Sequence, residues 1–121
     1  MVTFRLFGGG ENGSADDVTA HLGLRPSHVS RDGLGWLLCS ASGAEDGVEL
    51  AVQLRRLLDI LEPVTGRLWE LVGSGYEANW LCYLGSHATE HAAELDRDTM
   101  RRLLGLPGDL WLDVYDEEPS A

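Results

Sequence analysis

Apolar and polar side chains alternate in two well-separated stretches of the chain, residues 2–7 and residues 110–115. An alternation with period two is typical of a strand that buries one face. Residues 36–39 and 76–84 are short, mostly apolar runs bounded by Gly and Ser, and they predict two more strands. The pattern therefore predicts four strands spread over the whole length of the chain.

A helical period dominates the middle of the sequence. Five leucines recur there at helical spacing and share one stripe: Leu50, Leu54, Leu57, Leu58 and Leu61. Pro63 cannot continue that helix but suits the first turn of the next one, whose apolar side contains Leu68, Trp69, Leu71 and Val72. We expect the leucine helix to cover the core, and Gly73 to end the helix after it.

Capping residues mark two further helices. Ser14 with Asp17 three residues later resembles a capping box, and Gly23 suits the end of that helix. Asp96 precedes a second segment with apolar residues at 100, 103 and 104, which Gly105 ends. Residues 25–33 between the first helix and the second strand are predicted to be irregular.

These elements predict a single α+β domain over residues 1–116. Its sheet has four strands and is mixed or mostly antiparallel, with three to four helices packed mainly on one face. Residues 117–121 form an acidic, frayed C-terminal tail. A chain of 121 residues is long enough to bury a core of its own.

Four short stretches resemble a bacterial family known as domain of unknown function 4279. In chain order they are Leu22-Gly23-Leu24-Arg25-Pro26, Gly35-Trp36-Leu37-Leu38, Leu61-Glu62-Pro63-Val64 and Leu112-Asp113-Val114-Tyr115. The chain differs from the family pattern before Trp36, where we expect a longer Gly-containing loop than residues 30–34 provide. The resemblance implies a single small α+β domain and no known reaction.

Charge restricts the partners of the protein. Twenty acidic residues face nine Arg and no Lys, which gives a formal net charge of −11. Such a chain repels nucleic-acid phosphates and anionic lipid surfaces, and it favours a basic protein partner. No run of residues is long and apolar enough to span a bilayer, and no leader is apparent, so we expect a cytoplasmic protein. We also expect Cys39 and Cys82 to be reduced and buried.

Residues 8–13 fit the dinucleotide pattern G-x-G-x-x-G between a strand and a helix. Glu11, Asp16 and Asp17 would oppose a pyrophosphate at the positive start of that helix. A Walker loop is excluded because its Lys is absent. We therefore interpret the glycines as a turn and predict no cofactor.

His87, Glu90 and His91 match the inverted zinc-peptidase motif H-x-x-E-H. On a helix, the two histidines would lie one turn apart and could bind a metal beside Glu90. Solvated side chains in a polar connection are the simpler interpretation, because apolar residues that could dock such a helix are missing. A small metal-dependent hydrolase is the alternative function, and no catalytic residue is assigned otherwise.

The first and last strands also predict a binding surface. If their apolar residues face the helices, Arg5, Trp111, Asp113 and Tyr115 share the other face of the sheet, where Asn79 and Tyr83 are further candidates. Aromatic residues mixed with charge are typical of protein interfaces. A covering element or simple cross-strand pairing would also explain them. The favoured function is a non-enzymatic protein-binding module, in its most specific form an immunity-like protein that neutralises a basic partner; a second copy of the chain is the alternative partner.

Overall fold

The computed structural model describes residues 1–8, 13–40, 49–85 and 94–115. Strands and helices are interspersed along the chain. They are β1 (Val2–Phe7), α1 (Ala15–Leu22), β2 (His28–Val29), β3 (Gly35–Cys39), α2 (Leu50–Leu61), the 3₁₀ helix η1 (Glu62–Val64), α3 (Thr65–Gly73), β4 (Glu77–Gly85), α4 (Arg97–Leu104) and β5 (Asp109–Tyr115). The predicted α+β class is confirmed, and Pro63 lies in a 3₁₀ turn that precedes α3.

The sheet is mixed and has five strands in the order β2-β3-β1-β4-β5. All pairs are antiparallel except β4 with β5, which run parallel. The prediction of four strands was wrong, because it missed β2, which lies in the segment predicted to be irregular. Two residues are too few to show a period, and β2 is an extended segment because it pairs with β3.

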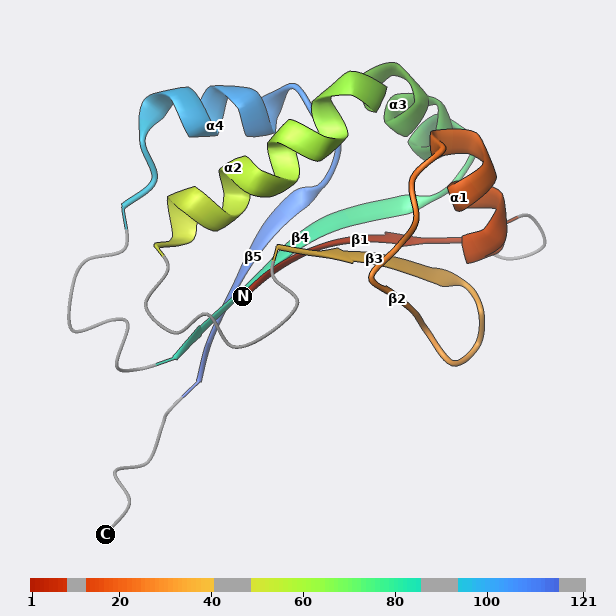
Figure 1. Cartoon of the computed structure of the whole chain (residues 1–121), viewed down its shortest axis with the longest axis horizontal. Coiled ribbons are helices and arrows are strands. Elements are labelled where there is room, and N and C mark those ends of the chain that lie inside the picture. Colours follow the sequence, from red (N-terminus) through yellow and green to blue (C-terminus); the bar gives the residue numbers. More distant parts are fainter. Residues whose placement is uncertain (9–12, 41–48, 86–93, 116–121) are drawn as a thin grey trace, which may run out of the picture.

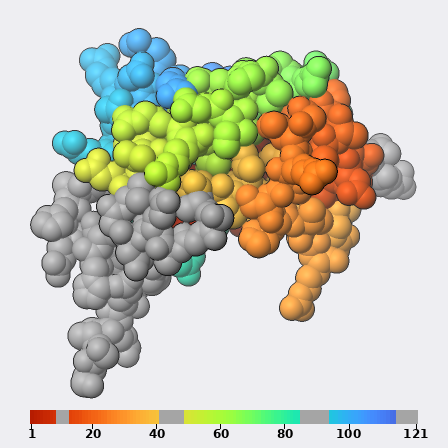
Figure 2. All heavy atoms as spheres, in the orientation of Figure 1, coloured from red at the N-terminus to blue at the C-terminus, as the bar shows by residue number. Residues whose placement is uncertain are grey.

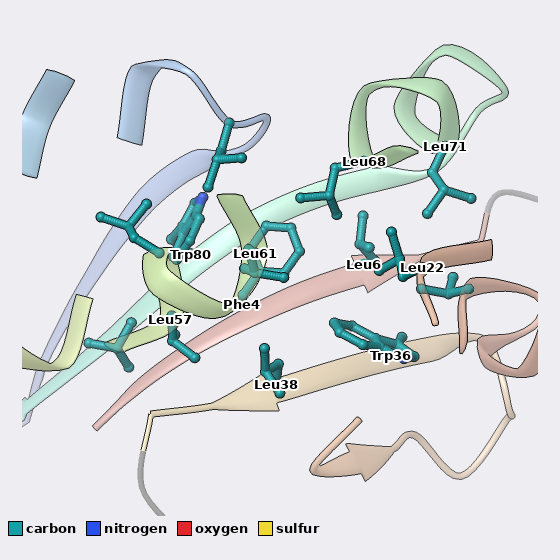
Figure 3. Close-up of a cluster of buried hydrophobic side chains, with 14 of the residues drawn as sticks. Phe4, Leu6, Leu22, Trp36, Leu38, Leu57, Leu61, Leu68, Leu71 and Trp80 are labelled. Carbon is teal, nitrogen blue, oxygen red and sulfur yellow. The ribbon is translucent and has the colours of Figure 1, made fainter. Parts of the chain in front are cut away.

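All four α-helices lie on the same side of the sheet (Figure 1). Their side chains form one continuous layer from α4 through α2 and α3 to α1 (Figure 2). Between this layer and the sheet lies the core, in which the ring centroids of Phe4 and Trp80 are 4.7 Å apart beneath Leu61 (Figure 3). Four residues of the predicted leucine stripe of α2 are inaccessible to solvent, namely Leu54, Leu57, Leu58 and Leu61, whereas Leu50 is only partly buried.

Helix α1 begins and ends as its sequence predicts. The Ser14 hydroxyl accepts a hydrogen bond from the Asp17 amide, and the Asp17 carboxylate accepts one from the Ser14 amide, which completes a capping box. Gly23 ends the helix in the left-handed conformation, with φ of 70°. The indole of the buried Trp36 donates to the Thr19 hydroxyl at 3.1 Å, which fixes α1 against β3.

The ends of the glycine-rich segment pack closely. A side chain on Gly8 would collide with the carbonyl oxygen of Gly13, and one on Gly13 would collide with the ring of Tyr76. Gly13 also has a φ of 144°, which side-chain-bearing residues rarely adopt. The turn between β1 and α1 thus has a structural reason for both terminal glycines; residues 9–12 lie outside the described part.

Helix α4 begins after Asp96 and ends at Gly105 as predicted, but it buries few of its apolar residues. Of the apolar residues at 100, 103 and 104, only Leu103 packs against the core, while Met100 and Leu104 are 41% and 83% exposed. The fully buried residue of α4 is Thr99, whose hydroxyl donates to Asp96 at 2.6 Å. The apolar positions at 100 and 104 therefore do not mark the face that the fold buries.

Two smaller predictions are also corrected. Trp69 was placed on the apolar side of α3, but it is 47% exposed and its indole donates to the Gly105 carbonyl. Both cysteines are free as predicted; Cys82 is fully buried, whereas Cys39 is only partly buried. None of the helices in the described ranges has the length and apolar character that crossing a membrane requires.

Candidate functional site

The face of the sheet opposite the helices collects the side chains predicted to bind a partner. Strand pairing places Arg5 of β1 beside Asn79 of β4, and Leu81 of β4 beside Trp111 of β5. Because side chains two residues apart share a face, Asp113 lies on this open face as well. The predicted grouping of Arg5, Trp111 and Asp113 on one face is confirmed. Tyr115 pairs with Gly85 at the end of β5, and its side chain lies outside the described part.

Arg5 is the cation of this face. Its Nε donates to the Asn79 side-chain oxygen at 2.6 Å, and its guanidinium carbon lies 5.5 Å from the ring centroids of both Phe7 and Trp111. Contact with an aromatic face stabilises a guanidinium and fixes its orientation. Within the described residues, the Arg5 guanidinium has no carboxylate partner at ion-pair distance. Arg5 is therefore held in place by the rings of Phe7 and Trp111 and by its hydrogen bond to Asn79.

A hollow of about 440 Å³ opens beside Trp111, where β4 and β5 begin. We call it the Trp111 hollow. It is lined by Val72, Tyr76, Glu77, Ala78, Asn79, Gly108, Asp109 and Trp111. Gly108 leaves room for this arrangement, because it has a φ of 114° and a side chain there would press on Ala78 and Trp80.

Two carboxylates line the Trp111 hollow, those of Glu77 and Asp109. Both residues are exposed. Asp109 pairs with Asn79, and Asn79 follows Glu77 by two residues, so all three side chains lie on the open face. No cation among the described residues forms an ion pair with either carboxylate. An exposed aromatic ring next to two unpaired carboxylates is an arrangement suited to a positively charged side chain.

Sequence reasoning missed the two carboxylates. Glu77 and Asp109 start separate strands about thirty residues apart along the chain. They come together only because β4 and β5 run parallel, so that both strand starts lie at the same end of the sheet. The parallel pairing was not predictable from the alternation of apolar residues, which is the same in parallel and antiparallel edge strands.

Other candidate chemistries find little in the described part. His87, Glu90 and His91 lie outside the described residues, so the metal site stays a prediction. Within residues 1–8, 13–40, 49–85 and 94–115, no group of three His, Cys, Asp or Glu side chains is arranged to hold a metal ion. Burial raises the pKa of the Cys82 thiol to about 11, which keeps it protonated and unreactive at neutral pH.

Comparison with known proteins gives a family match and no activity. Neither the curated proteins nor the solved structures compared with the chain include a match. The sequence profile of one family, described as a domain of unknown function, matches residues 1–117, which is nearly the whole chain. The expected membership is confirmed, and the chain belongs to the DUF4279 family.

Proposed function

We propose that this domain is a non-enzymatic protein-binding module that holds a basic segment of its partner against the open face of the sheet. The observation that carries the proposal is the Trp111 hollow, in which an exposed indole lies beside the unpaired carboxylates of Glu77 and Asp109. A Lys or Arg side chain is the ligand that such a hollow suits, because the ring and the carboxylates both attract a cation.

The charge of the whole protein supports the same partner. At a net charge of −11, long-range attraction speeds the encounter with a basic protein and slows the encounter with acidic ones. Neutralisation of a basic partner, as an immunity-like protein performs it, is the specific form of this proposal. Under this proposal, Arg5 holds Trp111 in place, while Asp113 and the neighbouring strand β4 border the contact with the partner.

Fluorescence of Trp111 tests the proposal directly. The chain has four tryptophans, of which Trp36 and Trp80 are buried, so a Trp69→Phe background leaves Trp111 as the exposed indole. We expect a short Arg- and Lys-rich peptide to change its emission saturably, with an affinity that falls as salt rises. An acidic peptide of equal length is the control probe.

Two double variants with the same net charge separate a local site from general attraction. Glu77→Gln/Asp109→Asn removes the carboxylates of the hollow, whereas Asp16→Asn/Asp98→Asn removes two exposed carboxylates at helix starts. We expect the first variant to lose most of the peptide affinity and the second to keep it. Equal losses in both variants, or a response to the acidic peptide, would contradict a basic-residue site at the Trp111 hollow.

A further inference from the structure

Strand β5 is an edge strand with apolar side chains exposed on both faces. Leu110, Leu112 and Val114 point to the helix side but are 39%, 59% and 55% exposed, and Trp111 on the open face is 54% exposed. Among the described strands, β5 pairs with β4 alone, and its outer backbone groups face away from the sheet. A long edge with apolar side chains is a template for pairing with another strand.

The two edges of the sheet differ in how they are protected. The other edge, β2, has two residues, and a short edge strand offers little backbone for pairing. β5 has seven residues in unbroken register with β4, and neither Pro, Lys nor a bulge interrupts it. Pro, Lys and bulges are usual means of blocking an edge. The two charged residues of β5, Asp109 and Asp113, lie on the open face, so the helix side of the edge is apolar throughout.

We propose that β5 pairs antiparallel with β5 of a second copy of this chain and joins the two five-stranded sheets into one. A two-fold axis perpendicular to the sheet relates the copies, which is the commonest symmetry of soluble dimers. The two helix layers then lie on the same side of the joined sheet. The proposal does not depend on the basic-partner function, because it uses the outer edge of β5 and leaves the open face on one side of the dimer.

Charge selects the register of this pairing. A two-fold axis brings together residues of the same face, so the axis passes beside one residue of β5. Centred on Trp111, the pairing would set Asp109 opposite Asp113 of the second copy; centred on Asp113, it would set that residue opposite itself. Directly opposed like charges destabilise a strand pair. Centred on Leu112, the pairing avoids both contacts and uses all seven residues of β5.

The Leu112 register is self-complementary on both faces. On the helix side, Leu112 meets Leu112 of the second copy, and Leu110 meets Val114, which covers the exposed apolar stripe. On the open face, Asp113 of the second copy lies opposite Trp111, the ring over which the Arg5 guanidinium is held.

Cross-linking at the two-fold axis tests the register. In a Cys39→Ser background, Leu112→Cys brings the two introduced thiols opposite each other across the two-fold axis, so mild oxidation should give a disulfide-linked dimer. Leu110→Cys alone should give none, whereas a mixture of Leu110→Cys with Val114→Cys should form a mixed dimer. Cys82 is left in place in every variant, because it is fully buried and should form no cross-link. A cross-link through Leu110→Cys alone would overturn the register.

Sedimentation equilibrium of the unmodified chain tests the dimer itself. We expect a reversible dimer that salt strengthens, because each copy carries −11 charges, whereas salt should weaken binding of a basic peptide. Leu112→Lys sets two cations opposite each other and should weaken the dimer about tenfold or more, which requires only about 1.4 kcal/mol. A chain that is monomeric at every concentration, or a dimer that Leu112→Lys leaves unchanged while the melting curve shows it folded, would overturn the proposal. The Trp111 titration reads the basic-partner function separately.

Discussion

Helices α2 and α4 lie on the same side of the sheet but bury very different amounts of apolar surface there. α2 buries a stripe of leucines against the central strands, whereas α4 buries Thr99 and leaves Leu104 83% exposed. α4 also contacts its neighbours through Arg102, whose guanidinium donates to Glu62 at 2.6 Å and to Asp59 at 2.7 Å. The core thus ends between α2 and α4, and β5 lies on the side where apolar residues remain exposed.

This difference separates the stable part of the domain from the part available for binding. Apolar burial over the central strands supplies the folding free energy, since each fully buried Leu contributes about 1.5 to 3 kcal/mol. Exposed ion pairs contribute little. The region of α4 and β5 adds less to stability and carries the aromatic and apolar surface that the proposals use. A contiguous group of exposed apolar side chains on one strand is a feature of interaction sites.

Leucine truncation on the two helices gives the largest expected effect. Leu54→Ala should destabilise the domain by about 2 to 5 kcal/mol, because it leaves a cavity at the centre of the core. Leu104→Ala is the matched change on α4 and should cost less than about 0.5 kcal/mol. Denaturant unfolding at low protein concentration measures both. Similar losses in the two variants would contradict the division between α2 and α4.

Tryptophan substitution makes the same comparison on neighbouring strands. The indole of Trp80 donates to the Pro107 carbonyl at 3.2 Å inside the core, so Trp80→Phe removes a buried hydrogen bond and should cost about 1 to 3 kcal/mol. Trp111→Phe changes an exposed ring that contacts Arg5 and should cost less than about 1 kcal/mol. If Trp111→Phe is the more damaging change in thermal unfolding, β5 belongs to the stable part of the domain.

Removal of the Arg102 cation should have a smaller effect. Arg102→Gln breaks the contacts to Glu62 and Asp59 and should destabilise the domain by about 0.2 to 1 kcal/mol, because the acidic partners are exposed. Arg101→Gln removes the same charge from an exposed neighbour and is the control. A loss of several kcal/mol in chemical unfolding would show that ion pairs, and not apolar burial, dominate the attachment of α4.

The pH dependence of that effect has a definite sign. The hydrogen bond from Arg102 lowers the pKa of Glu62 below its ordinary value of 4.5. A carboxylate with a lowered folded-state pKa stabilises the protein above its unfolded-state value, and the contribution is lost as pH falls through the folded-state value. The stability difference between wild type and Glu62→Gln should therefore be present at pH 7 and shrink below about pH 4.5. A difference that grows on acidification would contradict the role assigned to Arg102.

The sequence by itself determined the helices, four of the five strands and the α+β class. Their signals are local: the leucine period of α2, the capping box at Ser14 and the alternation in β1 act over a few residues. The alternation also determined that Arg5, Trp111 and Asp113 share a face, because side chains two residues apart in a strand point the same way.

The tertiary structure alone decided which apolar residues stay exposed and which carboxylates meet. Leu110 and Leu112 have the same apolar chemistry as Leu54, but they lie on the edge strand and stay exposed, and Leu104 lies on the exposed side of α4. Glu77 and Asp109 meet at the Trp111 hollow because β5 enters the sheet parallel to β4. Strand β2 forms only because β3 offers it a backbone partner. Local sequence patterns cannot specify these features, because burial and strand order depend on contacts between segments far apart in the chain.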